Sequence, residues 1–422
     1  MPSSQITKLL ELANKKNLEE FAIQLCTSYP ELNNLTDAVI TPESYESHFQ
    51  GRILGKHVEF DKSVVAILSL CWTFTGNYTK LVECQQGPSK LKESTFRKLQ
   101  KWVVSQIQNE KELEFALICI LMNDLGKVPD YKEYAKQHGY DCIDHDQILY
   151  HAFKTAKLYP QDMTRLFPST KHLNSKQIDL IEETLKVDFK FAQFIQAENV
   201  PECLDSFARS TEFKKTILLH AIFDLIGAAG HVKQNGSLVL TEDTCNDILQ
   251  AQEILLQKNI SSRQMYHRYL QCRNKSFGFD ENWITLTRIA CMCRFHTKED
   301  VVPLLDAWNC LHFSKRIKLD EEFGLELTPS LLLYYSPAMF VNAMKRKEIE
   351  KQDNLFQTFQ TIYEICLFVR DQLSMKKDMN DFYYIQVDVG SVAKKISENI
   401  FPTNFELKVS TSKTNEGILL CL

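Results

Sequence analysis

The sequence contains little of what loop-rich and fibrous proteins require. Glycine accounts for 13 and proline for 12 of its 422 residues, below the average usage of about 7% and about 5%. This scarcity argues against turn-dense β-sandwiches, collagen-like repeats and flexible linkers. We therefore expect a mainly α-helical fold.

Long apolar runs and an excess of positive charge are also missing. The chain has no segment of 18 or more apolar residues, and its N-terminus lacks the apolar core of a signal peptide. Its formal net charge of -5 argues against nonspecific binding to nucleic acid, which requires a basic surface. We predict a cytoplasmic protein whose partners include neither a membrane nor a nucleic acid.

Cysteine is present at 13 positions, most of them inside apolar helical runs such as 116–120. A short secreted chain with this many cysteines would form disulfides, but here they are spread over a long chain. We therefore interpret them as reduced, buried thiols.

The pattern of apolar residues divides the chain into three parts. Apolar residues recur at intervals of three and four from Ile6 onward, as in amphipathic helices. We predict an N-terminal helical segment and connection over 1–50, a helical bundle domain over 51–235, and a further helical region over 236–422. The turn-rich stretch 234–237 marks the second boundary. The last fifty residues contain β-favouring stretches, so the fold should end in a small β element.

The most informative segment is the apolar run 115–122, which Asn123 and Asp124 follow directly. A carboxylate at the end of a buried helix must be ion-paired, hydrogen-bonded or bound to a metal. Two interpretations of Asp124 follow. Either Lys127 or nearby backbone amides satisfy it, or it is a metal ligand.

Two histidines downstream have a similar pair of interpretations. Asp144 and Gln147 have the spacing of a capping box that opens a helix, which places His145 in the first helical turn. His172 lies just before a helix that Asn174 begins. Each histidine is either a solvated polar residue or a ligand.

A later apolar helix carries a polar stripe. His220, Asp224 and His231 lie on one helical face, and small residues such as Gly227 beside them allow another backbone or a ligand to approach closely. Because two imidazoles and a carboxylate are costly on an apolar helix without partners, we expect all three to face the domain interior. A hydrogen-bonded structural trio and a metal site explain the stripe equally well.

The order of Asn123-Asp124, His145, His172 and Asp224 resembles the HD-domain superfamily of helical metal-dependent proteins. In that family a His-Asp dyad ends a buried helix and is often followed by Gly-Lys. By the resemblance, Asp124 corresponds to the dyad aspartate and Asp224 to the closing aspartate on a later helix. His145 and His172 correspond to two additional histidines of diiron members. The resemblance covers roughly residues 60–235.

The sequence departs from the family pattern at two points. Asn123 replaces the dyad histidine, and no histidine lies between His57 and His138, where the first ligand is expected. An amide oxygen is a poor substitute for imidazole on a transition metal, although it suits magnesium or calcium. His57 could substitute for the missing ligand only from farther away.

The resemblance implies a metal-dependent phosphoester hydrolase that acts on a nucleotide or a similar small phosphorylated molecule. A divalent metal (Mg, Mn or Fe) would lower the pKa of a bound water, and the resulting hydroxide would attack the phosphoester. The implied metal ligands are Asp124, His145, His172, His220 and Asp224. Asp124 and Lys127 are the implied catalytic residues, with Lys127 as the phosphate contact. Asn123 and His231 are further polar candidates.

Two other functions remain open at this point. One is a noncatalytic helical scaffold or regulatory protein with a degenerate HD-like site, which Asn123 and the missing histidine favour. The other is an HD-type iron-dependent oxygenase, which requires more ligands than the sequence offers.

Overall fold

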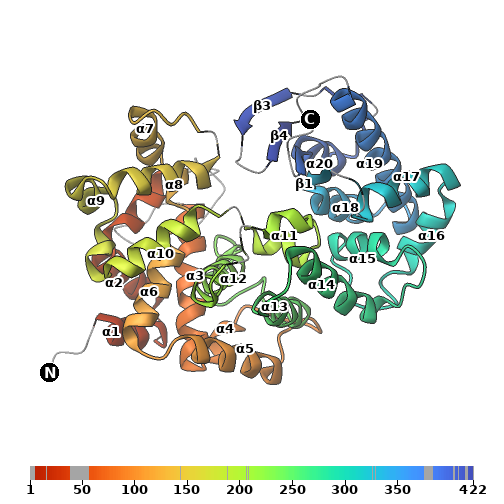
Figure 1. Cartoon of the computed structure of the whole chain (residues 1–422). Coiled ribbons are helices and arrows are strands. Elements are labelled where there is room, and N and C mark those ends of the chain that lie inside the picture. Colours follow the sequence, from red (N-terminus) through yellow and green to blue (C-terminus); the bar gives the residue numbers. More distant parts are fainter. Residues whose placement is uncertain are drawn as a thin grey trace. The chain divides into compact units, whose positions relative to one another are not determined.

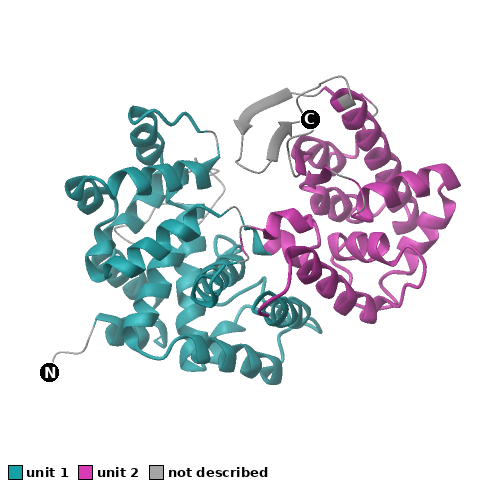
Figure 2. Ribbon diagram, in the orientation of Figure 1, with its two compact units in different colours: residues 1–191, 209–256 teal, residues 192–208, 257–422 magenta. Residues whose placement is uncertain are grey.

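The computed structural model describes residues 5–421 except Lys16, 39–56, Ile143, Asp188, Ser206, Ala208, Glu326, Thr328, 375–383, Thr403, Leu407 and 414–416. The described residues form many helices and one small sheet (Figure 1), which confirms the expected mainly α fold with a C-terminal β element. They fold into two compact units (Figure 2). Unit 1 comprises residues 1–191 and 209–256, and unit 2 comprises 192–208 and 257–422.

Unit 1 is helical throughout its described part. Its elements are α1 (Gln5–Ala13), α2 (Leu18–Ser28), η1 (Pro30–Asp37), α3 (Val58–Thr75), α4 (Tyr78–Leu81), α5 (Glu93–Gln106), α6 (Glu110–Met122), η2 (Leu125–Lys127), α7 (Pro129–Gln137), α8 (His145–Ala156), α9 (Pro160–Leu166), η3 (Pro168–His172), α10 (Ser175–Leu185), α12 (Thr211–Gly227) and α13 (Glu242–Leu255). The η elements are 3₁₀ turns. The predicted N-terminal helical segment contains α1 and α2.

The core of unit 1 is built around α3. Almost every residue from Phe60 to Trp72 is buried, because the sequence there is apolar on all sides and α5, α6 and α12 pack around it. The closest approach is at Gly227 of α12, where an added Cβ would lie 2.6 Å from the Lys62 carbonyl oxygen. The small residues beside the polar stripe therefore admit another backbone, that of α3.

Unit 2 combines helices with the sheet. Its elements are α11 (Phe191–Ile195, whose first residue lies in unit 1), η4 (Pro201–Leu204), α14 (Ser262–Phe277), α15 (Trp283–Met292), α16 (Val302–Cys310), α17 (Phe313–Phe323), β1 (Ser330–Tyr334), α18 (Ser336–Met344), α19 (Lys351–Ser374), β2 (Tyr384–Asp388), α20 (Gly390–Ser397), β3 (Lys408–Lys413) and β4 (Gly417–Cys421). The strand order is β1-β2-β4-β3. β1 and β2 pair in parallel, so a crossover must join them, and α18 and α19 lie within it.

The units differ from the three-part division that we predict from the sequence. α1 and α2 pack within unit 1, and so does α13, beyond the expected boundary at 234–237. The reason is hydrogen bonding across that turn: the Gln85 amide donates to the carbonyls of Ser237 and Leu240, at 2.6 and 2.9 Å. A turn-rich stretch thus marks a corner inside a unit.

The structure bears on two sequence predictions, those about membrane spans and about the cysteines. Within the described residues, no helix combines the length and the apolar character that a membrane span requires. Twelve cysteines are free thiols, and eight of these are buried. Burial raises the pKa of thiols such as Cys26 and Cys71 to about 12, which keeps them protonated.

Candidate functional site

Two of the polar residues singled out by the sequence lie near the C-terminal ends of α6 and α12. The two helices pack against each other in unit 1. Asn123 is the C-terminal cap of α6, and its side-chain amide lowers the pKa of Asp224 on α12.

Asp124 is satisfied by Lys127. The 3₁₀ turn η2 brings the lysine back over the aspartate, so that Nζ lies 2.6 Å from Asp124 Oδ1. The same Nζ lies 2.7 Å from Oε2 of Glu59, in the first turn of α3. The ammonium therefore bridges two carboxylates that are 65 residues apart in the sequence, and both of these side chains are less than a tenth exposed.

The shared lysine controls the charge of Glu59. Burial alone would raise the pKa of this carboxyl, but Lys127 and then Lys62, whose Nζ lies 2.9 Å from Glu59 Oε1, lower it to about 2. Burial opposes the charge of Lys127 too, yet Asp124 and Glu59 raise its pKa above the ordinary value. Glu59 and Lys127 are therefore ionised near neutral pH.

Gly126 fixes this turn against the start of α8. A Cβ at Gly126 would lie 1.9 Å from the carbonyl oxygen of His145 and 3.0 Å from the Cβ of Leu149. No side chain fits there, so the backbone of η2 lies directly on the first turns of α8. The glycine of the Asp-Leu-Gly-Lys segment is therefore explained by packing.

The first turn of α8 holds a second polar group. Asp144 caps the helix by accepting hydrogen bonds from the amides of Asp146 and Gln147, at 2.9 and 3.2 Å, as its spacing predicts. His145 Nε2 lies 3.3 Å from Asp146 Oδ1, and Lys190 forms an ion pair with Asp146.

Asp144, His145 and Asp146 each offer one ligand atom, and these atoms lie within 4.8 Å of one another. They are the one group of this kind among the residues that the structure describes. Asp124, His145 and Asp224 do not form such a group there. The metal set implied by the resemblance stays a prediction.

The two polar groups act on each other electrostatically. Burial and then the negative charge of Asp124 raise the pKa of Asp224 to about 7, while Lys127, Asn123 and Lys190 oppose this shift. Burial, followed by the charges of Lys190 and Lys127, lowers the pKa of His145. Near pH 7, Asp224 is therefore about half protonated, which is unusual for a carboxyl group, and His145 is mainly neutral.

The remaining candidate histidines take three different positions. His220 and Asp224 are partly buried on α12, as the stripe predicts. His231 is partly buried too, but it is not on the helix, because α12 ends at Gly227 and His231 lies in the turn that follows. Burial lowers the pKa of His220 to about 4, and burial followed by Lys62 lowers that of His231. His172 lies elsewhere: its Nδ1 is 3.6 Å from Glu114 Oε1, on α6 roughly 15 Å before Asp124 along the helix axis.

The sequence did not identify Glu59 and Lys190, which form ion pairs with Lys127 and Asp146. Glu59 lies in the polar first turn of an otherwise apolar helix, a position that helix-dipole arguments explain without any partner. Lys190 lies between two buried phenylalanines, and a charge in such surroundings could have been recognised as one that needs a partner. Both reach the site only through tertiary packing.

Comparison with known proteins identifies a family whose function is unknown. A family model described as "Family of unknown function (DUF6829)" matches residues 29–406. No curated protein and no solved structure matches the chain. The functional argument therefore depends on the site itself.

Proposed function

Because the chain belongs to DUF6829, a family of unknown function, we propose its function from the site: a noncatalytic, HD-like helical protein with a regulatory or ligand-binding role. In this proposal, ion pairs between lysines and carboxylates have replaced the metal of a hydrolase. The observation that carries it is the position of the Lys127 ammonium, 2.6 Å from Asp124 and 2.7 Å from Glu59.

Lys127 supports the proposal through the chemistry of its ammonium group. In a metal site, an aspartate and a residue from an upstream helix would share a cation; here Asp124 and Glu59 share Nζ. An ammonium is a point charge that balances carboxylates. It has no open coordination position at which a water could be activated as a nucleophile.

Asn123 and Asp224, near Asp124, also favour a noncatalytic protein. Metal ligands must be deprotonated, and burial together with Asp124 raises the pKa of Asp224 to about 7. The neighbouring Asn123 offers an amide oxygen, which is a poor ligand for a transition metal. A structural cluster of polar side chains needs no change in the protonation state of Asp224.

The second candidate is the metal-dependent phosphoester hydrolase, which the group at the start of α8 favours. Asp144, His145 and Asp146 could supply three ligand atoms. A metal there would compete with Lys190 for Asp146 and with two backbone amides for Asp144. The observed partners therefore favour the noncatalytic protein.

The experiment measures bound metal, stability and phosphatase activity on the same samples of wild type and Asp124→Ala. We expect wild type grown with added manganese or iron to hold well under one equivalent of metal and to leave a generic aryl phosphate intact. Asp124→Ala should lose about 1–3 kcal/mol of unfolding free energy, because Lys127 and Glu59 lose a partner. Metal content should not change.

Asp179→Ala is the matched control, since Asp179 is an exposed carboxylate paired with Lys157 at 2.5 Å. Its loss should cost at most about 1 kcal/mol. One equivalent of metal that Asp124→Ala removes would overturn the proposal. Metal removed by His145→Ala, with aryl phosphate hydrolysis lost at the same time, would establish the second candidate instead.

A further inference from the structure

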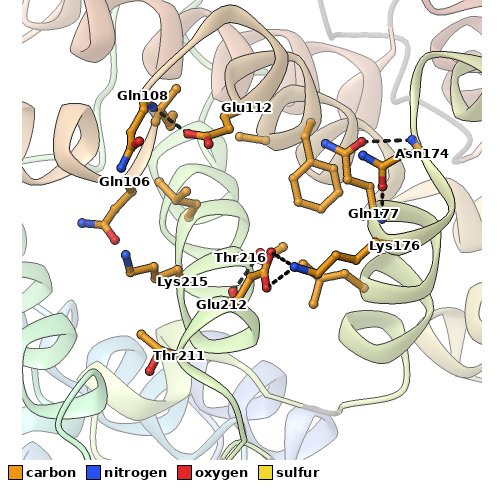
Figure 3. A pocket seen from close by; sticks show the side chains of 15 residues that line it. Gln106, Gln108, Glu112, Asn174, Lys176, Gln177, Thr211, Glu212, Lys215 and Thr216 are labelled. Carbon is orange, nitrogen blue, oxygen red and sulfur yellow. Dashed lines mark hydrogen bonds and ion pairs between the residues drawn. The ribbon is translucent and has the colours of Figure 1, made fainter.

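Unit 1 contains a pocket that shares no residue with the ion-pair cluster of Glu59, Lys62, Asp124 and Lys127. Its volume is about 550 Å³, within the range of roughly 300–1,000 Å³ usual for small-molecule sites. Side chains of α6, α10 and α12 and of residues 106–108 line it (Figure 3). Part of the lining is apolar and includes Phe115, Leu180 and Leu219, and the rest is amides, hydroxyls and charges.

The charges that line the pocket are not equally engaged. Lys176 Nζ lies 3.0 and 2.8 Å from the two carboxylate oxygens of Glu212, and Glu112 Oε2 accepts the backbone N–H of Gln108 at 2.6 Å. Lys215 is partly buried, and within the described residues it has neither a hydrogen bond nor an ion pair. Among the described lining residues, Lys215 is therefore the one cation without a counter-ion, and Glu112 is the one carboxylate without a cation.

An unpaired acceptor lies near this lysine. The Gln106 amide nitrogen donates to Ser105 Oγ at 2.6 Å, while its Oε1 is buried without a hydrogen-bond partner. Figure 3 shows Gln106 and Lys215 on the same side of the pocket. Because this oxygen is out of reach of solvent, Lys215 is the group that a ligand meets on this side of the pocket, and its natural partner is an anion.

The opposite side of the pocket offers donors. Asn174 and Gln177 form a capping box that uses their side-chain oxygens. Asn174 Oδ1 accepts from the backbone N–H of Gln177, and Gln177 Oε1 accepts from the backbone N–H of Asn174. Their NH₂ groups remain as donors on the pocket wall (Figure 3). The first turns of α10 and α12, which also line the pocket, add partial positive charge.

We propose that this pocket binds a small phosphate monoester with a hydroxyl-bearing body, such as a phosphorylated sugar or cyclitol. The phosphate pairs with Lys215, next to the side chain of Gln106. The body packs its C–H face on Phe115, and its other hydroxyls accept from the NH₂ groups of Asn174 and Gln177. The site is additional to the proposed function, because neither the metal content nor the ion pairs of the cluster enter the argument.

The test is calorimetric titration of the full chain with ribose 5-phosphate, glucose 6-phosphate and inositol 1-phosphate. Glucose, inositol and inorganic phosphate are the matched partial probes. We expect at least one monoester to bind with a Kd below about 1 mM and at least about tenfold more tightly than its partial probes. Binding by inorganic phosphate alone, or by none of the three monoesters, would overturn the proposal.

Variants locate the binding. Lys215→Ala removes the unpaired cation, and Gln106→Glu places a negative charge next to the phosphate in a side chain of the same shape. Each should weaken the monoester at least about tenfold with an unchanged thermal midpoint. Lys132→Ala, an exposed lysine on α7 outside the pocket, should bind like wild type. If Lys215→Ala and Gln106→Glu both bind as wild type does, the ligand lies elsewhere and the proposal is wrong.

Discussion

Each unit contains a cation with several hydrogen-bond or ion-pair partners, but the partners are of opposite kinds. In unit 1, the ammonium of Lys127 is about a quarter exposed and lies between two carboxylates. In unit 2, Arg288 is 1% exposed and donates to backbone carbonyls. The acceptors are those of Ala197, Phe323, Glu198 and Asn199, at 3.2, 2.9, 3.4 and 3.0 Å.

The two cations therefore respond differently to pH. The planar guanidinium matches several fixed carbonyls at once, so Arg288 ties segment 192–208 to the rest of unit 2. Carboxylate partners can instead be protonated when pH falls, which releases the ammonium. The cation of unit 1 is therefore held by groups that titrate, and that of unit 2 by groups that do not.

The largest effect should come from Arg288→Met. The substitution leaves buried carbonyls unsatisfied, each at a cost of about 1–3 kcal/mol, so we expect a loss of about 3 kcal/mol or more in the unfolding free energy. Arg288→Lys should recover little of it, since an ammonium cannot reach the same carbonyls together. Urea unfolding measures both variants. Arg97→Met, at an exposed pair with Glu93, should cost under about 1 kcal/mol; an equal loss at both sites would remove the distinction.

The next effect concerns how the site of unit 1 is positioned. Gly126→Ala places a Cβ 1.9 Å from the His145 carbonyl oxygen, so η2 must move away from α8. We expect a loss of about 1–3 kcal/mol, measured by urea unfolding. In Gly139→Ala the added Cβ meets nothing within 4 Å, and only the positive φ of 91° is costly. A smaller loss for Gly126→Ala than for Gly139→Ala would contradict the close approach.

The local parts of this site were predictable from sequence, and the long-range parts were not. The apolar run before Asn123, the Asp124–Lys127 spacing and the cap at Asp144 are each decided within a few residues, and the structure has them all. Glu59 reaches Lys127 across 68 residues, and only the packing of α3 on α6 determines that contact. A resemblance in residue order could not distinguish a metal from an ammonium.

A smaller effect is expected for Lys127→Met, which removes the shared cation. Lys127 is partly solvated, so we expect a loss of about 1–2 kcal/mol near pH 7. Because the folded pKa of Glu59 is lowered from 4.5 to about 2, its stabilisation is complete above about pH 4.5 and disappears as pH falls toward 2.

The acid limb of the stability curve should therefore be shallower in Lys127→Met than in wild type, as measured by urea unfolding from pH 2 to pH 7. Lys80→Met, at a surface pair with Glu83, is the control and should keep the wild-type limb. Identical acid limbs for Lys127→Met and wild type would show that the ion pair does not hold Glu59 ionised.

The most specific effect is expected for Asp224→Asn. Burial and Asp124 raise the folded pKa of Asp224 from 3.8 to about 7, so between these pH values the folded chain keeps a proton that the unfolded chain releases. This group therefore makes wild type less stable as pH rises from about 4 to 7, and the asparagine removes that dependence. Relative to wild type, Asp224→Asn should gain unfolding free energy between pH 4 and pH 8, while Asp179→Asn should not. A metal on Asp224 would lower its pKa and reverse the sign, so a relative loss over the same interval would favour the hydrolase over the ion-pair cluster.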